Sequence, residues 1–195
     1  MVPEREQSTG TTVANPVITV VYVDDFLIVL NKPSGLLSVP GRGPDKQDCL
    51  SARVQTHYPD ALVVHRLDMS TSGLIVMARS AATQRALSTA FSARTVHKRY
   101  EAIASGAIAI GPPATWQTIA MPIAVDWPNR PLRLIAADGQ PSETRYQVLH
   151  IAADQQSTRV ALEPVTGRTH QLRVHLKAIG HPILGDALYA PQAVS

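Results

Sequence analysis

The sequence contains a single cysteine, Cys49, and no long hydrophobic run. One cysteine excludes an internal disulfide framework and a zinc site built from cysteines, and a small buried side chain is the usual role of a lone thiol. No apolar stretch reaches the roughly 18 to 20 residues that cross a bilayer, and the polar start Met1–Gln7 is not a secretory signal. We therefore expect a cytoplasmic protein that does not enter a membrane.

The sequence also lacks internal repeats, heptads and low-complexity tracts. Its 195 residues are 45% hydrophobic and 17% charged, which is ordinary for a globular protein and excludes general disorder. The net charge of +3 gives only a weak preference for an acidic polymer, such as a nucleic acid, as partner. The polar residues 1–16 end at Pro16 and predict a flexible N-terminal arm, and 17–195 fit one folded domain.

Segments rich in β-branched and aromatic residues outnumber helical segments. They predict strands over 17–23, 26–30, 61–68, 74–79, 98–104, 143–152 and 157–163. Asp48, Ser80 and Thr169 are the predicted N-caps of three helices, which end near Tyr58, Arg94 and Ile179. The proline-rich segment 107–142 predicts long loops with short strands. Together these patterns favour an α+β fold with a mixed, largely antiparallel sheet flanked by a few helices.

The most informative stretch, 65–73, reads HRLDMSTSG and places charged side chains where a strand enters a turn. If this strand end is extended, Arg66 and Asp68 share one face and can serve one ligand together. A surface ion pair is the alternative for an isolated Arg-x-Asp. A second stretch, 166–176, reads TGRTHQLRVHL and predicts a glycine-containing turn before a basic helix, where Arg168 and Arg173 suit an anion.

Three motifs occur together: HRLDxxTSG at 65–73, KxY ending at Tyr100, and GRTHQ-hydrophobic-RxHL at 167–176. This combination resembles the RluA branch of the pseudouridine synthases. The similarity also takes in 31–42, 126–131 and 180–186, so it extends from about residue 17 to 190. It is closest to compact members without an N-terminal S4 RNA-binding domain, and it implies a pseudouridine synthase catalytic domain over 17–195.

The resemblance implies roles for individual residues. Asp68 would be the essential catalytic aspartate, and Arg66 would enter the RNA stack when the target uridine leaves it. Tyr100 would lie against the flipped base, and Arg168 would be the basic partner of Asp68. Further candidates for contacts to the RNA backbone are Lys98, Arg99, Arg130 and Arg173.

The reaction implied by the resemblance breaks a C1′–N1 glycosidic bond of uridine and forms a C1′–C5 bond. Nothing is oxidised and no group is lost, so we expect no cofactor and no metal. A carboxylate can serve as nucleophile or base, and a neighbouring arginine favours its ionised form. Extruding a base from folded RNA costs a few kcal/mol, which Arg66 and Tyr100 would offset by filling the vacated position and stacking.

Members of this branch act on a hairpin loop of 23S ribosomal RNA and on the anticodon loop of transfer RNA. The resemblance thus implies RNA stem-loops as substrate, with a monomeric enzyme and no obligate protein partner. Family members continue past the position where this chain ends through a Leu-rich segment and a final strand. We therefore expect that the catalytic domain lacks its C-terminal segment here.

Two other functions remain open from the residues. An RNA N-glycosidase would cleave the same bond with water, since an aspartate beside a flipped base serves both reactions. A catalytically inactive RNA-binding module would use Asp68 only to orient Arg66. A kinase catalytic loop is excluded because no Gly-rich loop precedes Arg66 and no Asp-Phe-Gly follows it. His170 and His175 are five apart and do not match the His-Glu-x-x-His zinc motif.

Overall fold

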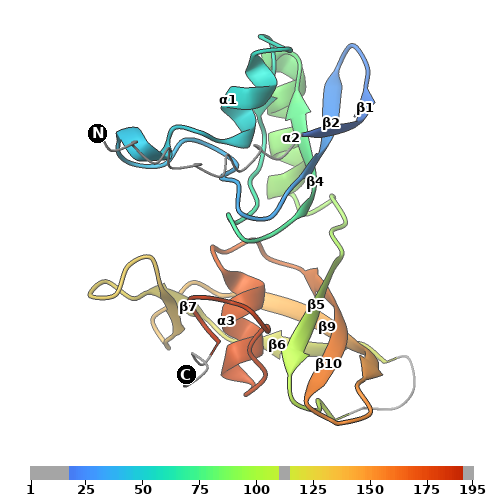
Figure 1. Ribbon diagram of the computed structural model, residues 1–195, viewed down its shortest axis with the longest axis vertical. Coiled ribbons are helices and arrows are strands. Elements are labelled where there is room, and N and C mark those ends of the chain that lie inside the picture. The colour runs from blue at the N-terminus through green and yellow to red at the C-terminus, as the bar shows by residue number, and fades with distance from the viewer. Residues whose placement is uncertain (1–17, 110–114, 191–195) are drawn as a thin grey trace, which may run out of the picture. The chain divides into compact units, whose positions relative to one another are not determined.

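The computed structural model describes residues 18–109 and 115–190, and the chain divides into two compact units, Met1–Leu87 and Ser88–Ser195 (Figure 1). The predicted arm over 1–16 lies outside the described residues. The prediction of one domain over 17–195 stays a prediction, and each unit is described by itself. Among the described residues, no helix has the length and apolar character needed to cross a membrane.

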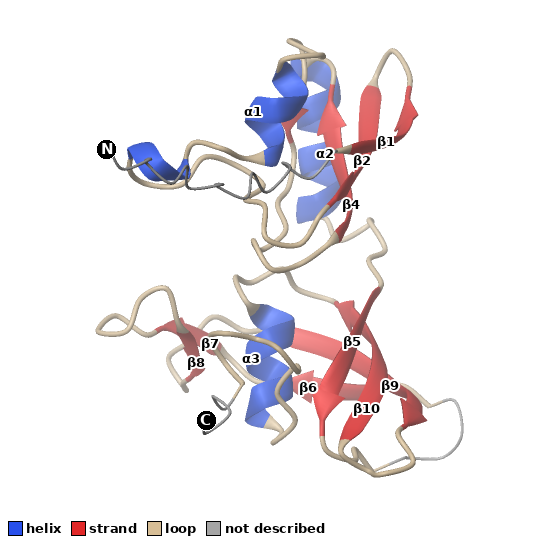
Figure 2. Ribbon diagram, viewed as in Figure 1, coloured by secondary structure: helices blue, strands red, loops and turns tan. Residues whose placement is uncertain are grey.

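The first unit is built on a four-stranded antiparallel sheet with the order β1-β2-β4-β3 (Figure 2). Its strands are β1 (Thr19–Val23), β2 (Leu27–Lys32), β3 (Leu62–Val63) and β4 (Gly73–Ala78). Side chains alternate between the two faces of a strand, and alternate residues of β2, Ile28, Leu30 and Lys32, are fully buried. Two apolar side chains and one lysine therefore point into the same interior.

The strand predicted over 61–68 is wrong beyond Val63. The ladder between β3 and β4 stops there, and the backbone N–H of Val76 donates instead to the side-chain Nε2 of His65, 3.0 Å away. Because a side chain satisfies the N–H group that a strand partner would have taken, 64–68 need not continue the sheet. The HRLD segment is consequently an irregular, hydrogen-bonded connection rather than an extended strand.

Two helices belong wholly or partly to this unit. Helix α1 (Leu50–Gln55) follows a short 3₁₀ turn, η1 (Pro44–Lys46), and buries Leu50 and Val54. The predicted cap Asp48 is wrong: Cys49 is the N-cap, and its sulfur accepts from Ala52 N at 3.5 Å. Asp48 instead forms a two-pronged salt bridge with Arg53, with both contacts at 2.6 Å.

Helix α2 (Ala81–Ser92) contains the boundary between the two units. The hydroxyl of Ser80 accepts from the backbone N of Thr83 at 3.2 Å, so the predicted cap of this helix is confirmed.

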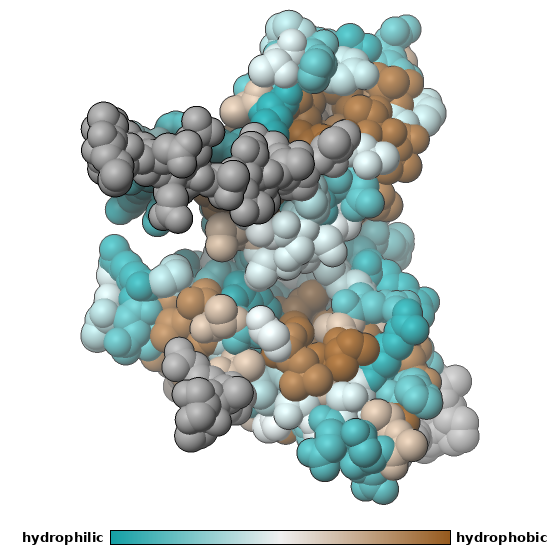
Figure 3. Space-filling view, viewed as in Figure 1, coloured by the Kyte–Doolittle hydropathy of each residue, from teal (hydrophilic) through white to brown (hydrophobic). Residues whose placement is uncertain are grey.

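Strand β1 is the edge of the first sheet, and all five of its residues are exposed. Apolar surface gathers over β1 and β2 in the space-filling view (Figure 3). Exposed apolar side chains in this region are Val20, Val21, Val23 and Phe26.

The second unit has a four-stranded antiparallel sheet with the order β5-β10-β9-β6 and a separate two-stranded hairpin, β7-β8. The strands are β5 (Tyr100–Ser105), β6 (Gln117–Ala120), β7 (Ile123–Val125), β8 (Arg133–Ile135), β9 (Glu143–Ile151) and β10 (Ser157–Pro164). Helix α3 (Gln171–Ala178) lies against this sheet (Figure 2). Leu176 of α3 packs with Val160 and Leu162 of β10 in one core.

The start of α3 differs from the prediction, whereas its end agrees with it. His170 is the N-cap, with a left-handed φ of 58°, and no side chain caps the helix there, so the predicted cap Thr169 is wrong. Gly180, with φ of 88°, follows the helix as predicted for a glycine after a C-terminus. The predicted α+β class is confirmed by the antiparallel sheets and few helices, and every strand pair among the described residues is antiparallel.

Candidate active site

Asp68 lies in the irregular connection between β3 and β4 of the first unit. Its side chain is half-buried, its neighbour Leu67 is buried, and Arg66 is exposed. The backbone N of Thr71 donates to the carbonyl oxygen of Asp68 at 3.1 Å, which closes a tight turn. The predicted catalytic carboxylate is thus fixed in a turn beside the core, and the predicted RNA-inserting arginine reaches into solvent.

The residue before Asp68 is fixed by Ser38, a buried side chain from a distant part of the sequence. Its hydroxyl donates to the carbonyl oxygen of Leu67 at 2.7 Å and accepts from the backbone N of the same residue at 3.1 Å. One hydroxyl can do both because it has one donor and two acceptor lone pairs. Ser38 therefore holds both backbone polar groups of Leu67.

The residues after Asp68 are fixed by the turn that follows β2. Lys32, which has no exposed surface, donates from Nζ to the carbonyl oxygens of Pro33 and Leu36 at 2.8 Å and of Met69 at 3.1 Å. Gly35 N also donates to the Met69 carbonyl at 2.8 Å. A lysine ammonium has three N–H donors, so these three carbonyls account for all of them.

Lys32 also places a positive charge near Asp68. Burial lowers the pKa of Lys32, and the attraction of its ammonium to the Asp68 carboxylate opposes that shift. No role of Lys32 was predicted from the sequence, although this residue lies in segment 31–42, which resembles the family. The signal for it in the sequence is a lysine at an inward position of an otherwise apolar strand.

In the second unit, Arg168 lines a groove of about 560 Å³. Its Nε donates to the carbonyl oxygen of Pro141 at 3.3 Å, which holds the guanidinium at the groove wall. The groove residues are Arg94, Ala120, Pro122, Ala137, Gly139, Pro141, Ser142, Glu143, Thr166 and Arg168. Arginine side chains at such a groove suit an anionic ligand.

Two further cationic residues belong to this part of the second unit. Lys98 Nζ lies 4.0 Å from the position that a β-carbon on Gly167 would occupy. Burial lowers the pKa of Lys98, and the charge of Arg94 lowers it further. Sequence reasoning missed Arg94, which is exposed and has a left-handed φ of 61° after the end of α2.

The GRTHQ segment is held by Gln171, the first residue of α3. Its Oε1 accepts from Thr166 Oγ1 at 2.6 Å and from the backbone N of Arg168 at 3.0 Å. Its Nε2 donates to the Glu143 carbonyl at 2.9 Å and to Thr144 Oγ1 at 3.0 Å. Gln171 is buried, so this amide fixes the backbone of Arg168 from inside the protein.

His175 continues this network and is fully buried. Its Nε2 lies 2.9 Å from the Met121 carbonyl, and its Nδ1 lies 2.9 Å from Thr144 Oγ1. Because a carbonyl only accepts, Nε2 carries the proton of the neutral ring and Nδ1 accepts from the threonine hydroxyl. Burial lowers the pKa of His175, which favours this neutral form.

The other predicted residues of the second unit occupy different settings. Tyr100 is half-buried at the start of β5, pairs with Leu162 and packs against the core. Arg99 is exposed, with its guanidinium 5.8 Å from the ring of Trp116. Arg130 is exposed on the β7-β8 loop.

Arg173 is only 9% exposed, unlike the other candidate phosphate contacts. It forms a two-pronged salt bridge with Asp186 at 2.7 and 2.8 Å. The Asp186 carboxyl also accepts from the backbone of Leu188 and Tyr189. Burial raises the pKa of Asp186, but these bonds and the arginine charge outweigh it and hold that pKa below its usual value. Arg173 thus has a structural partner, and we do not count it among the RNA contacts proposed below.

Arg66 and Asp68 belong to the first unit, and Tyr100 and Arg168 belong to the second. The pairing of Asp68 with Arg168 therefore stays a prediction from the resemblance, as do the roles of Arg66 and Tyr100. Within the described residues, no three His, Cys, Asp or Glu side chains form a group that could hold a metal ion.

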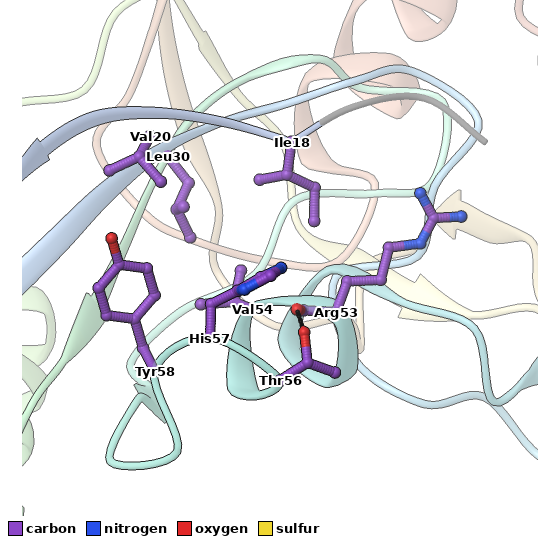
Figure 4. A pocket seen from close by; sticks show the side chains of 8 residues that line it. All are labelled: Ile18, Val20, Leu30, Arg53, Val54, Thr56, His57 and Tyr58. Atoms are coloured by element: carbon purple, nitrogen blue, oxygen red, sulfur yellow. Dashed lines mark hydrogen bonds between the residues drawn. The ribbon is translucent and has the colours of Figure 1, made fainter. Parts of the chain in front are cut away.

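The first unit has another hollow, of about 380 Å³, which is separate from the Asp68 turn (Figure 4). It is mostly apolar and is lined by Ile18, Val20, Leu30, Arg53, Val54, Thr56, His57 and Tyr58. The hydroxyl of Thr56 donates to the carbonyl oxygen of Arg53 at 2.6 Å within it. Neither Arg66 nor Asp68 lines this hollow, so it is not the candidate active site.

A sequence model of the RNA pseudouridylate synthase family matches residues 26–178, which include both motif-bearing turns. The chain belongs to this family. The enzyme is therefore an RNA pseudouridine synthase, with RNA as its substrate and isomerisation of uridine as its reaction.

Curated relatives and solved structures agree with this membership. The chain is 48% identical over 180 residues to the dual-specificity RNA pseudouridine synthase RluA of Escherichia coli O6:H1, a match that covers 91% of this chain and 80% of the relative. It is 46% identical to the protein of the same name in Vibrio parahaemolyticus, covering 91% and 71%. The structure resembles human RNA pseudouridylate synthase domain containing 1, with a TM-score of 0.73, 31% identity, and coverage of 90% and 71%.

Proposed function

We propose that this pseudouridine synthase modifies two kinds of RNA, a stem-loop of 23S ribosomal RNA and the anticodon stem-loop of transfer RNA. The observation that supports it is the 46% to 48% identity to relatives named as dual-specificity enzymes, over 91% of this chain. Loops of RNA offer unstacked bases with accessible edges, whereas A-form stems offer mainly backbone and shape. A compact basic enzyme therefore suits small stem-loops.

Asp68 is the catalytic carboxylate in this proposal. Hydrogen bonds hold the turn on both sides of Asp68, from Ser38 to Leu67 and from Lys32 to Met69, so the backbone of Asp68 keeps one position relative to the first sheet. A carboxylate so placed acts as nucleophile or base, and the reaction needs no cofactor or metal because it only moves a glycosidic bond.

Base flipping is assigned to Arg66 and Tyr100. Arg66 is exposed two residues before Asp68, so its planar cation can fill the position that the target uridine leaves. Tyr100 stacks on the flipped base, and base–aromatic stacking contributes about 1 to 3 kcal/mol. Arg168 is assigned as the basic partner of Asp68, and Lys98, Arg99 and Arg130 are assigned as contacts to the backbone of the RNA.

We further propose that the enzyme is a monomer in the cytoplasm that needs no protein partner. Its substrates in this proposal are cytoplasmic RNAs, and each stem-loop is small enough for one catalytic domain.

The catalytic assignment is tested by release of tritium from RNA that carries 5-tritiated uridine. Asp68→Asn should abolish release while RNA affinity stays within about tenfold, because phosphate contacts supply most of the affinity. The control Asp48→Asn alters an exposed carboxylate of the same unit, which is engaged with Arg53, and should leave release unchanged. Turnover by Asp68→Asn at the wild-type rate would remove Asp68 from the mechanism.

The product separates this proposal from its rivals. An N-glycosidase would leave an abasic site and free uracil, whereas isomerisation leaves pseudouridine in an intact chain. An RNA-binding module would bind the stem-loops and release no tritium even as wild type. EDTA should not lower the rate.

The substrate assignment is tested with isolated anticodon and ribosomal hairpins, mapped by carbodiimide treatment and primer extension. Both hairpins should acquire pseudouridine at one loop position. Modification of one hairpin alone would reduce the proposal to single specificity, and modification of neither would defeat it.

A further inference from the structure

The loop between β7 and β8 presents an aromatic ring stacked on an arginine. Trp127 is 67% exposed, more than any other large hydrophobic side chain of the described residues. The guanidinium carbon of Arg130 lies 3.6 Å from the centroid of its ring. At this distance the planar cation stacks on the indole, so one face of the ring is covered and most of the remaining side chain meets solvent.

The loop that carries this pair is closed by its own hydrogen bonds. The carboxylate of Asp126 accepts from the backbone N of Asn129 at 3.2 Å and from its Nδ2 at 3.1 Å. The backbone N of Asp126 donates to the Leu132 carbonyl at 3.1 Å, and Leu132 N donates to the Asn129 carbonyl at 2.9 Å. A loop ordered in advance loses little conformational entropy when a ligand binds.

The hairpin is also anchored to the body of the second unit, beside α3 (Figure 2). The backbone N of Arg133, the first residue of β8, donates to the hydroxyl of Tyr189 at 2.9 Å. Tyr189 is buried and packs with Ile123 of β7 and Val174 of α3. The loop that carries the exposed Trp127 is therefore anchored to the core of the second unit.

The same hairpin adjoins the basic groove. Pro122, immediately before β7, and Ala137, two residues after β8, both line the groove that contains Arg168. Trp127 follows Pro122 by five residues, and an extended chain spans at most about 3.6 Å per residue, so the two lie within about 18 Å. An RNA strand seated in the groove can therefore reach the loop within a few nucleotides.

We propose that Trp127 and Arg130 form a stacking platform for one unpaired nucleobase of the RNA substrate, outside the nucleotide that is isomerised. The base stacks on the open face of the indole, while Arg130 holds the other face and adds positive charge for the adjoining phosphate. This inference rests on the proposed function for the identity of the RNA. RNA is favoured over an apolar protein partner because every base has a π face and the cation suits its backbone.

Fluorescence of Trp127 tests the stacking directly. The chain has two tryptophans, so Trp116→Phe leaves Trp127 as the one reporter. An unpaired RNA hexamer of uridines and the ribosomal stem-loop should both quench its emission saturably. An abasic hexamer with the same ribose-phosphate backbone should bind without quenching. Unchanged emission at saturating stem-loop would overturn the platform, as would equal quenching by the abasic strand.

Affinity measurements with matched variants complete the test. Trp127→Ala should weaken stem-loop binding about tenfold, within the range expected for one base–aromatic stack, and Trp127→Phe should recover part of that loss. Arg130→Ala should also weaken binding, and the double variant should lose less than the two single losses combined, because the pair acts as one unit. The control Phe26→Ala removes an aromatic side chain of 65% exposure from the first unit and should bind normally.

The two proposals fail in different ways. The weaker RNA binding of Trp127→Ala should appear mainly as a higher KM. The rate of tritium release at saturating RNA measures the chemical step separately. A wild-type enzyme that quenches with RNA but makes no pseudouridine would sink the proposed function and support the platform. A wild-type enzyme that makes pseudouridine, beside a Trp127→Ala variant of unchanged Kd and KM, would sink the platform alone.

Discussion

Lys32 Nζ donates to the carbonyl oxygen of Met69 at 3.1 Å and so ties the end of β2 to the residue that follows Asp68. Two residues 37 positions apart in sequence are joined by a buried charge, and that charge also attracts the Asp68 carboxylate. The stability of the first unit and the position of the proposed catalytic group therefore depend on the same side chain.

Lys32→Met should destabilise the protein strongly. The apolar replacement leaves the carbonyls of Pro33 and Leu36 without their lysine donor and leaves the Met69 carbonyl only its bond from Gly35 N, and an unsatisfied buried polar group costs about 1 to 3 kcal/mol. We expect the free energy of unfolding in urea to fall by about 3 kcal/mol or more. Ser34→Ala removes an exposed bond to the Ser70 carbonyl of the same turn and should cost less than about 1 kcal/mol; equal losses would contradict the role of Lys32.

Ser38→Ala should lower catalysis more than stability alone explains. The hydroxyl holds the backbone N and O of Leu67, so its loss frees the turn that carries Asp68. Misplacement of a catalytic group by about 1 Å can cost as much as a hundredfold, and we expect kcat to fall by about tenfold or more. The matched control is Ser51→Ala, since both serines are 5% exposed and Ser51 contacts Cys49 instead. A kcat that falls equally in both variants would show a general effect of destabilisation.

The free energy of unfolding should fall as the pH is lowered, because the buried His175 resists protonation in the folded protein. In the unfolded chain this histidine binds a proton near its ordinary pKa of 6.5, whereas burial lowers its pKa in the folded protein. Below pH 6.5 the unfolded state therefore holds more protons, and the free energy of unfolding falls as the pH falls until the folded pKa is reached. For one proton the slope cannot exceed about 1.4 kcal/mol per pH unit.

Urea unfolding at several pH values measures this slope. His175→Gln cannot titrate and should flatten the slope in that window, even if it lowers stability throughout. His57→Gln, an exposed side chain outside the network, should keep the wild-type slope. An unchanged slope in His175→Gln would refute the assignment. Asp186, whose pKa is lowered, loses its contribution in a separate window, as the pH falls below its ordinary 3.8.

Replacement of Arg66 and replacement of Arg168 should impair different steps of the reaction. Arg66→Ala should abolish the fluorescence increase of a 2-aminopurine placed beside the target uridine, because the base no longer leaves the stack. Arg168→Ala should keep that increase and lower the rate of tritium release, because it disturbs Asp68 rather than flipping. A normal 2-aminopurine signal in Arg66→Ala would exclude Arg66 from flipping.

Local sequence patterns determined the secondary structure where neighbouring residues decide it. The Ser80 cap depends on a side chain three residues from its partner, and most of the strands depend on runs of β-branched residues, so both could be predicted. The predictions of Asp48 and Thr169 as caps were wrong because neighbouring side chains form other hydrogen bonds. Arg53 binds the Asp48 carboxylate, and Gln171 binds the backbone N of Arg168 in the GRT turn.

The sequence by itself determined the family, because the Asp68 and Arg168 motifs are recognisable as strings of residues. Only the tertiary structure decided what holds those motifs and which cations remain exposed. The sequence does not distinguish Arg173 from Arg130 as candidate phosphate contacts. In the structure, Arg173 is buried in a salt bridge with Asp186, whereas Arg130 is exposed on the β7-β8 loop against Trp127. Lys32 also bonds locally to Pro33 and Leu36, but its bond to Met69 crosses 37 residues, and the bonds of Ser38 to Leu67 cross 29. Hydrogen bonds of such separation form only once the chain has folded, so no short sequence pattern encodes them.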